Sequence, residues 1–464
     1  MSSISMTTFH VEQSVFMNRL KTWIGSALQA DDKVYLVGGT VRDLLIGREP
    51  KDIDLVCFNA RQFAKKIAKI HKAAFICLEK KKDEPCYRVV DKQNPENYID
   101  VVPFRGQTII EDLSVRDFTI NAIAIQIEIN NSNDIILEKI IDPVDGQTDL
   151  QNRLIRMTYP KCFESDPLRM LRAFRFATTY SLRIDPDTLS IISSQTLLLK
   201  QVSFERIYAE LLHTLNAISS LNSMTSMNEL GLLDLIFNEK ADSNVTRYID
   251  DHDIFRFQHI EYLLTHLHEF WPEFYQVIQL NLSSHNRLAM VKLAALLLGK
   301  YQELPIPSQS VPLSGSNSIQ KQWIEELSMR LKMSCVEREF LLKLLAYQQD
   351  VHGLSSFNPN EKDRMRLFRK LKADAVPVIL LSMAQSMTQD QSKITWCRQE
   401  ILHYYMYIEN ILKRPLLITG NDLISLGMSP GPHIGKMLNE VQEAQDNGEI
   451  VNKQDALDLV ARLR

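Results

Sequence analysis

The chain contains 464 residues, 45% of them hydrophobic and 24% charged, so it can bury several cores and should hold more than one domain. Its six cysteines are scattered without a Cys-x-x-Cys pair, which argues against a structural zinc site and a disulfide framework. The formal net charge of −4 excludes a globally basic nucleic-acid-binding protein, so any RNA-binding surface must be a local patch.

The amino-terminal residues lack a basic region followed by an apolar core, and no apolar run approaches the roughly 20 residues that a membrane span requires. We therefore expect a cytoplasmic protein with no membrane partner.

The pattern of apolar residues predicts an α+β head followed by an all-α remainder. After an amphipathic helix over residues 11–28, strands are expected at residues 34–37, 54–57, 75–78, 87–90, 98–102 and 122–127. From about Leu150 onward helical periodicity dominates, with helices expected at residues 166–180, 204–215, 259–270, 287–298 and 319–331. Residues 305–316 are rich in proline, serine and glycine and are expected to form an exposed loop.

The first expected strand leads into a glycine pair, Gly38 and Gly39. Glycines let backbone N–H groups approach a phosphate, and a helix expected from about Val41 to Leu45 would offer its positive N-terminus. Arg42 would add a charge-assisted contact. Alone, a glycine pair is ordinarily only a turn.

Two aspartates follow at close range. Asp52 and Asp54 lead into the apolar run 55–58, and in a strand residues i and i+2 share a face. Two carboxylates held this close repel unless cations lie between them, and Mg²⁺ is the usual partner of carboxylates plus phosphate oxygens. An isolated Asp-x-Asp is ordinarily a solvated loop, but this order and spacing predict a site for a nucleoside triphosphate and two metal ions.

A polar set stands within a later apolar stretch. Arg116, Asp117 and Asn121 belong to it, and Asp117 and Asn121 would share a helix face if that segment starts helical. The alternative is that Asp117 only caps a helix.

A second polar set opens the expected helix at residues 166–180. Asp166 and Arg169 are three residues apart on one face, with Pro167 in the first turn. An intrahelical salt bridge is the alternative interpretation. Arg172 and Arg175 continue this basic stripe and would hold Arg169, touch RNA or form a solvated helical face.

Four motifs in order resemble the motif set of the class II tRNA nucleotidyltransferases (CCA-adding enzymes) and bacterial poly(A) polymerases. They are residues 36–54, 116–124, 166–177 and 205–207. The resemblance implies a polymerase-beta-type nucleotidyltransferase head and a helical neck, body and tail. We expect these parts at residues 1–149, 150–220, 221–358 and 359–464. It also implies that nucleotides are added to an RNA 3′ end without a nucleic-acid template.

The resemblance implies a role for each motif. Asp52 and Asp54, with Asp100 as third carboxylate, would hold two Mg²⁺ ions that activate the RNA 3′-hydroxyl and stabilise the triphosphate charge. A lone aspartate at a strand edge, such as Asp100, would otherwise be structural. The nucleotide-binding residues that the resemblance implies are Gly38, Gly39, Arg42, Arg116, Asp117, Asn121, Asp166, Arg169, Arg172 and Arg175.

In the family, the acid and arginine that correspond to Asp166 and Arg169 read the Watson–Crick edges of CTP and ATP, a pattern that discriminates against uracil and guanine. Two positions depart from the family pattern. Val115 stands where a second arginine usually accompanies Arg116, and Ser165 replaces the acid that commonly precedes Asp166.

The segment after Asp100 is short, with only residues 101–112 before the arginine motif. This connection resembles the variant that adds CC to the tRNA 3′ end and leaves the final A to a partner enzyme. A tRNA 3′-terminal nucleotidyltransferase that uses CTP and ATP is therefore the leading interpretation, with CC addition favoured over complete CCA addition. A poly(A) polymerase and a non-catalytic RNA-binding relative are the alternatives.

Some relatives carry a metal-dependent phosphohydrolase with a His-Asp pair in the body. The matching stretch here, residues 293–300, contains neither residue, and the nearby histidines cannot restore the pair. These are His259, His266, His268 and His285. We expect a degenerate, scaffolding body.

Three further segments resemble parts of the family. Residues 205–207 would brace the neck, and Gly146 would let the head rotate. In the tail, residues 419–424 and 428–437 suit a backbone approach to RNA phosphate, for which a simple helical cap is the alternative.

Overall fold

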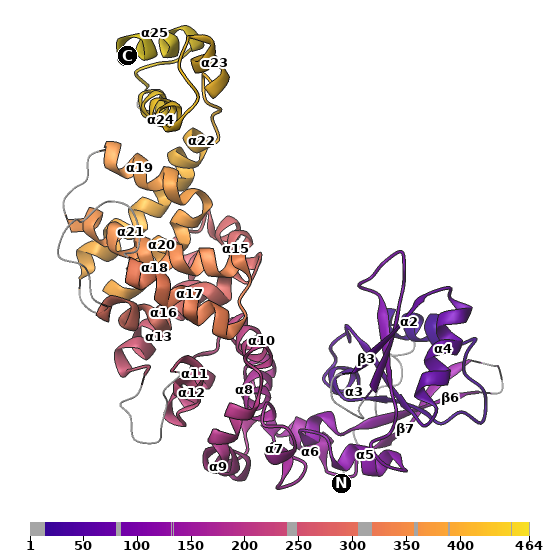
Figure 1. The fold of residues 1–464 in the computed structure, drawn as a ribbon. Coiled ribbons are helices and arrows are strands. Elements are labelled where there is room, and N and C mark those ends of the chain that lie inside the picture. Colours follow the sequence, from indigo (N-terminus) through magenta and orange to yellow (C-terminus); the bar gives the residue numbers. More distant parts are fainter. Residues whose placement is uncertain are drawn as a thin grey trace. The chain divides into compact units, whose positions relative to one another are not determined.

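The computed structural model describes residues 14–79, 85–130, 132, 134–238, 248–304, 318–356, 361–387, 390–446 and 448–463. It divides the chain into two compact units, Met1–Val202 and Ser203–Arg464 (Figure 1). None of the helices in these ranges is both long and apolar enough to cross a membrane. Three expectations lie outside the described residues: the loop at 305–316, the first turn of the opening helix before residue 14, and the boundary after residue 358.

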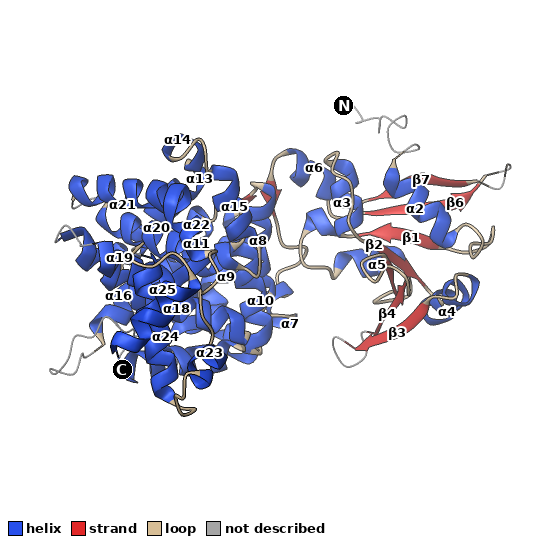
Figure 2. Ribbon diagram, turned by 90° about the horizontal axis from the view of Figure 1, so that it is seen from above, coloured by secondary structure: helices blue, strands red, loops and turns tan. Residues whose placement is uncertain are grey.

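A seven-stranded sheet is the framework of the first unit (Figure 2). Its strand order is β3-β4-β5-β2-β1-β6-β7, and only the neighbours β2 and β5 run parallel. The strands are β1 (Val34–Val37), β2 (Ile53–Cys57), β3 (Ala74–Glu79), β4 (Pro85–Val90), β5 (Tyr98–Val102), β6 (Ala124–Ile129) and β7 (Ile135–Ile141).

The sequence predicts six of these strands, each to within two residues, and it misses β7. That strand lacks a period-two alternation, because three apolar residues precede Glu138 and Lys139 and two follow them, and it is defined by antiparallel pairing with β6. The opening helix α2 (Val15–Ile24) is shorter than expected because the chain turns at Gly25.

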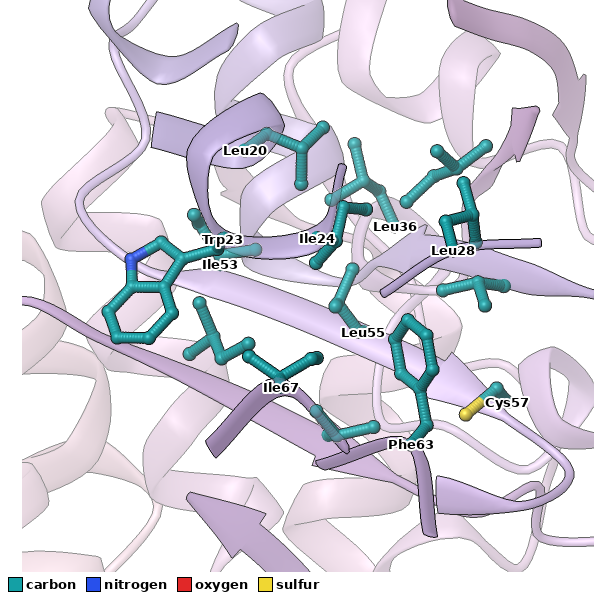
Figure 3. Packing of buried hydrophobic residues seen from close by; sticks show 14 of the residues in the cluster. Leu20, Trp23, Ile24, Leu28, Leu36, Ile53, Leu55, Cys57, Phe63 and Ile67 are labelled. Atoms are coloured by element: carbon teal, nitrogen blue, oxygen red, sulfur yellow. The ribbon is translucent and has the colours of Figure 1, made fainter. Parts of the chain in front are cut away.

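The two faces of the sheet pack against different helices, as period-two alternation requires. Helices α2 and α4 (Ala60–Ile70) cover one face, where Leu36, Ile53 and Leu55 join their buried side chains (Figure 3). On the other face, Tyr35, Val37 and Val56 cluster with residues of α5 (Ile109–Ser114). The polar residues that alternate with Ile53 and Leu55 must therefore point to the α5 side.

The rest of the first unit is mostly helical, with a parallel pair of two-residue strands, β8 (Leu154–Ile155) and β9 (Arg183–Ile184). Its elements are η1 (Thr119–Asn121), α6 (Gly146–Gln151), α7 (Cys162–Ser165), α8 (Arg169–Tyr180), α9 (Pro186–Gln195) and η2 (Thr196–Gln201). The expected head–neck boundary after residue 149 falls inside α6.

Gly146, at the start of α6, approaches η1 closely. A Cβ at this position would lie 2.1 Å from the carbonyl oxygen of Thr119, so no larger residue fits without a shift of the backbone. A hinge at Gly146 stays a prediction, but packing supplies a separate reason for glycine here.

All described elements of the second unit are helical (Figure 2). They are α10 (Phe204–Leu215), α11 (Leu221–Glu229), α12 (Leu232–Phe237), α13 (Asp251–Thr265), α14 (Leu267–Phe270), α15 (Tyr275–Ser283), α16 (Arg287–Glu303), α17 (Ser318–Leu331), α18 (Cys335–Ser356), α19 (Glu361–Leu371), η3 (Lys372–Asp374), α20 (Ala375–Ser386), α21 (Gln391–His403), the π-helical η4 (Tyr404–Ile408), α22 (Glu409–Leu412), α23 (Gly420–Ser425), α24 (Pro432–Asp446) and α25 (Lys453–Leu463).

Helix α16 is the centre of this unit. It packs against α10, α13, α15, α18 and α20, and every residue from Ala289 to Leu298 is buried. A helix that is apolar all round is expected in such a central position.

One charged residue lies within the buried stretch 289–298 of this helix. Lys292 is fully buried and its ammonium group lies 2.7 Å from Glu261 Oε1 of α13. It also donates to the carbonyl oxygens of Ala217 and Ile218 at 2.6 and 3.1 Å, while Glu261 accepts from the backbone N–H of Ser220 at 2.6 Å. Burial lowers the pKa of Lys292, and the Glu261 carboxylate counteracts this effect. The pair thus ties α13 and α16 to the link between α10 and α11.

A second polar contact joins α13 to residues 293–300 of α16, the stretch that the sequence predicts to be degenerate. The buried Asp253 lies 2.6 Å from Arg256, which also donates to the carbonyl oxygen of Ala295 at 3.0 Å. A Cβ at Gly299 would come within 2.5 Å of Asp253 Oδ1. The nearby His259 directs Nδ1 to the carbonyl oxygen of Ala384, 3.1 Å away. These contacts support α16 structurally and fit the expected scaffold.

The last three helices form a small cluster around Leu423, Val441 and Val460. Thr419 caps α23 in a reciprocal capping box with Asp422, and Lys453 of α25 lies 2.6 Å from Asp422. This arrangement accounts for residues 419–424 as a helical cap, and an RNA contact by the tail stays a prediction.

The buried Lys292–Glu261 pair generates a stability prediction. Replacing Lys292 with Met leaves a buried carboxylate without its cation, so we expect the second unit to lose about 3 kcal/mol of unfolding free energy. Denaturant titration followed by circular dichroism measures the loss. The double variant K292M/E261Q, which removes both charges, should be less destabilised than K292M alone, and equal loss in both would contradict the ion-pair account.

Candidate active site

The three candidate metal ligands lie on the α5 side of the sheet. Ile53 and Leu55 are buried on the α2–α4 side, so Asp54 points to the opposite face, with Asp52 in the same phase just before the strand. Asp100 lies between the buried Ile99 and Val101 of β5. The parallel register pairs Asp54 with Asp100 directly across β2 and β5. The structure thus brings the predicted carboxylates to one surface.

Asp100 is engaged by a basic residue that the sequence did not single out. Arg88 of β4 donates from Nε and Nη2 to the two carboxylate oxygens, each at 2.8 Å. Among the described residues, no group of three or more His, Cys, Asp or Glu side chains is arranged to hold a metal ion. All the same, the oxygen-only chemistry of Asp52, Asp54 and Asp100 fits Mg²⁺, which prefers carboxylate ligands.

The glycine pair is joined to the aspartates by a buried threonine. Thr40 Oγ1 donates to the carbonyl oxygen of Asp52 at 3.1 Å and accepts from the backbone N–H of Asp54 at 3.0 Å. The threonine belongs to α3 (Gly39–Leu45), whose N-cap Gly38 has a φ of 64°. Sequence reasoning assigned no role to Thr40, although it lies within the Gly-Gly-Thr run. It fixes the carboxylate segment against the start of α3.

Arg42 lies inside the unit, where its guanidinium already has several partners. It donates to Asn121 Oδ1 at 2.7 Å and to Asp43 Oδ1 at 2.9 Å, and it also hydrogen-bonds to the Tyr180 hydroxyl. Its Cζ lies 4.0 Å from the centre of the Tyr180 ring. The side chain is only 6% exposed. These contacts join α3, η1 and α8 through Arg42, and a direct phosphate contact by this residue stays a prediction.

Asp117 and Asn121, two polar residues that the sequence singled out, form a buried link to α8. Asp117 accepts from Asn121 Nδ2 at 3.1 Å and from Arg172 Nε and Nη2 at 2.9 and 2.6 Å. Burial raises the pKa of Asp117, but the Arg172 charge and hydrogen bonds outweigh it, so the net pKa lies well below the ordinary value. The expected helix face is wrong in detail, because the helical segment is a single 3-10 turn that begins at Thr119.

The chain Arg42, Asn121, Asp117, Arg172 will be called the polar link. Its two guanidiniums lie at the ends, with an amide and a carboxylate between them, so each group has a complementary hydrogen-bonding partner. In the polar link, Arg172 of α8 pairs with Asp117, a partner that the sequence did not predict for it. It connects the glycine pair to the helix that carries Arg169.

Arg116 is held by a buried carboxylate at the end of the short segment after Asp100. Its Nε and Nη2 donate to Asp112 Oδ2 at 2.9 and 2.8 Å, and the other oxygen of Asp112 accepts from the backbone N–H of Arg105 at 3.2 Å. A Cβ at Gly38 would lie 3.1 Å from Arg116 Nη1. The guanidinium therefore lies against the glycine pair, as a phosphate-binding group would.

The expected helical placement of Asp166 is wrong. Helix α8 begins at Arg169, and Asp166 is extended with φ −153° and ψ 97°. The cause is Pro167, since a residue before proline is driven out of the α region. Asp166 and Arg169 consequently do not share a helical face, although Arg169 still donates its backbone N–H to the Asp166 carbonyl oxygen at 3.0 Å.

Arg169 faces the loop that carries the arginine motif. Nη2 donates to the carbonyl oxygen of Val115 at 3.2 Å, and Nη1 lies 3.3 Å from both Ser165 Oγ and the Tyr159 hydroxyl. Both positions that depart from the family pattern, 115 and 165, thus contact Arg169. All these distances exceed the 2.9 Å typical of a strong N–H···O bond, so the partners are exchangeable.

Arg175 lies on the aromatic side of α8. Its Cζ is 4.1 Å from the centre of the Phe176 ring, which Arg172 and Arg42 also approach, at 5.1 and 5.3 Å. This stacking gives Arg175 a packing role in addition to the RNA contact that the sequence left open.

Comparison with family models matches three segments of the chain. Residues 34–156 match the poly(A) polymerase head domain, residues 181–243 match a probable RNA and SrmB-binding site of polymerase A, and residues 318–461 match a putative tRNA nucleotidyltransferase domain 2. The first match contains the sheet, the glycine pair and all three carboxylates.

Similar proteins cover nearly the whole chain. A CC-adding tRNA nucleotidyltransferase of Synechocystis sp. is 28% identical over 429 residues, 91% of each chain. A CCA-adding enzyme of Lactococcus lactis subsp. cremoris is 25% identical, over 92% of this chain and 91% of its own. Among solved structures, the Thermotoga maritima CCA-adding enzyme complexed with tRNA has the same fold, with a TM-score of 0.64 and 22% identity over 96% of this chain and 94% of its own.

Proposed function

We propose that this chain, which belongs to the tRNA nucleotidyltransferase and poly(A) polymerase family, is a tRNA 3′-terminal nucleotidyltransferase. It adds nucleotides of the tRNA CCA end from nucleoside triphosphates without a nucleic-acid template. The observation that carries the proposal is the in-register pair Asp54 and Asp100, beside Asp52, within the segment that matches the polymerase head. Because its substrates are tRNA and nucleoside triphosphates, we expect the reaction to take place in the cytoplasm.

The three carboxylates are the proposed ligands of two Mg²⁺ ions, because they offer only oxygen donors on one face of adjacent strands. When bound, these ions would lower the pKa of the RNA 3′-hydroxyl and offset charge on the triphosphate and the departing pyrophosphate. The protein fixes the ligand backbone through Thr40, whose hydroxyl bridges Asp52 and Asp54. Precise placement of the ligands is what this phosphoryl transfer demands of the protein.

Arg116 is the proposed triphosphate contact, supported by its position against Gly38. Its Asp112 partner sets the direction of the guanidinium. Arg42 and Asn121 act behind it, because the polar link absorbs their hydrogen-bonding groups. A small set of fixed donors beside a glycine turn suits a chain of phosphates.

Asp166 and Arg169 are the proposed readers of the incoming base. A carboxylate accepts from the amino group of cytosine or adenine, and a guanidinium donates to ring nitrogens and the carbonyl oxygen. The long contacts of Arg169 to Val115, Ser165 and Tyr159 support this role. A base edge can replace them at little cost because none is a strong hydrogen bond.

We further propose that addition stops after the second C. The short segment after Asp100 is closely held, because Glu111 accepts from the N–H of Gln107 at 2.7 Å and Asp112 accepts from the N–H of Arg105 at 3.2 Å. A Cβ at Gly106 would lie 2.5 Å from Glu111 Oε2. A connection held by hydrogen bonds at Arg105 and Gln107 has little freedom to reshape the base-binding pocket for ATP.

An incorporation assay tests the proposed function and its extent. With CTP and ATP supplied separately and together, we expect two C residues on a tRNA that lacks CCA, and no A on a tRNA that ends in CC. Gel resolution at one nucleotide gives the result. Complete CCA ends would contradict the CC-only proposal but not the family activity, whereas poly(A) tails on unrelated RNA would favour the poly(A) polymerase alternative.

Replacing Asp52 and Asp54 together with Ala tests the catalytic assignment. The loss of several kcal/mol of charge stabilisation corresponds to roughly a 10³-fold loss of incorporation rate, with tRNA binding retained in a filter-binding assay. The exposed Asp187 of α9 provides a matched control, since D187A removes a carboxylate elsewhere in the same unit. Substantial incorporation by the double variant would rule out these residues as metal ligands.

Two neighbouring acids test the positioning of Arg116, because Asp112 holds both Arg116 and the segment, whereas Glu111 holds only the segment. Asp112→Asn weakens a charge-assisted contact to Arg116, so KM for CTP should rise roughly tenfold with little change in kcat. Glu111→Gln loosens only the Gln107 turn and should leave KM for CTP unchanged. Steady-state kinetics with thermal unfolding of both variants measures this, and equal KM values for D112N and the unaltered protein would refute the role of Asp112.

A further inference from the structure

Arg88 forms an ion pair with Asp100 at the candidate metal site through two hydrogen bonds. It lies directly opposite Asp100 in the antiparallel register of β4 and β5. Both carboxylate oxygens accept a hydrogen bond from it at 2.8 Å, in the parallel two-bond geometry typical of arginine and carboxylate. The Asp100 side chain is 12% exposed and that of Arg88 29%, so solvent screens the pair only partly.

Tyr98 holds the guanidinium in place and extends the cluster to Asp52. The Cζ of Arg88 lies 3.9 Å from the centre of the Tyr98 ring, and Asp52 is among the charged groups that act on the Tyr98 hydroxyl. Arg88 thus touches one proposed ligand directly, and the ring on which it stacks interacts electrostatically with a second.

Three carboxylates on adjacent strands repel one another, and one fixed guanidinium among them reduces that repulsion. A divalent cation bound to Asp100 would lie close to the same guanidinium, because both would contact the same two oxygens. The cation must then displace Arg88 or accept its repulsion. The negative charge of a triphosphate would remove this penalty.

We propose that Arg88 is an internal counter-ion of Asp100, a positioning residue that competes with the divalent cation and makes its binding depend on the nucleoside triphosphate. This inference rests on the proposed function, in which Asp100 is a metal ligand. Arg88 keeps the third carboxylate oriented, and it keeps the affinity for the metal alone low. Metal and nucleotide consequently bind cooperatively.

Titration of the full-length protein with Mn²⁺ alone, followed by electron paramagnetic resonance, tests the competition. Arg88→Met keeps an apolar stem over Tyr98 and removes the charge, so Mn²⁺ affinity should rise on the order of tenfold. Arg88→Lys keeps the charge without the two-bond geometry and should lie between R88M and the unaltered protein. Unchanged or weaker Mn²⁺ binding by R88M would overturn the proposal.

A matched control and a double variant make the test specific. Arg156 also pairs with two carboxylates of this unit, Asp149 and Asp185 at 3.1 and 3.0 Å, and R156M should leave Mn²⁺ affinity unchanged. In an Asp100→Asn background the effect of R88M should disappear, because the competition acts through Asp100. Persistence of the full effect in D100N would refute the proposed route.

Two further measurements complete the design. A non-hydrolysable CTP analogue should raise Mn²⁺ affinity more in the unaltered protein than in R88M, and an equal gain would contradict the cooperative role. Mn²⁺ should also raise the Tm of R88M more than that of the unaltered protein, which provides a readout even if R88M is less stable. If D52A/D54A retains full Mn²⁺ affinity, the proposed metal site fails. If that variant loses Mn²⁺ binding and R88M has no effect, only the role of Arg88 fails.

Discussion

The alternation of side chains in β2 and β5 is the constraint on which the first unit depends. The apolar residues Ile53 and Leu55 bury themselves against α2 and α4, and the same pleat turns Asp54 to the other face. Parallel pairing then sets Asp100 beside it. A shift of one residue in either strand would bury a carboxylate and expose the core, so packing of the hydrophobic face also specifies the polar one.

The three carboxylates repel one another in this arrangement. The surrounding residues reduce that repulsion without neutralising the charge of the site. Arg88 pairs with Asp100 and stacks on Tyr98, and Thr40 fixes the backbone between the first two acids. Each of these residues comes from a different element. The site is therefore assembled from β2, β4, β5 and the start of α3, and its charge balance is a property of the fold.

Local sequence patterns were enough to predict much of this architecture and to identify the candidate carboxylates. Six strands and the shared face of Asp52 and Asp54 follow from periodicity, which each segment carries by itself. The partners of these residues could not be obtained in the same way. Arg88 reads as an ordinary strand residue until the register brings it opposite Asp100. Asp166 reads as helical unless the effect of Pro167 on its backbone outweighs the periodicity.

The polar link has a consequence for how the sequence can vary over evolution. Arg42 depends on Asn121, Asn121 on Asp117, and Asp117 on Arg172. Changing one member leaves a buried charge or amide without its complement, which costs more than the contact itself contributes. Single replacements along this chain should therefore be rare, and accepted changes should come as coordinated sets. The residues of the polar link in α3, near η1 and in α8 are distant in sequence, but we expect them to be replaced together during evolution.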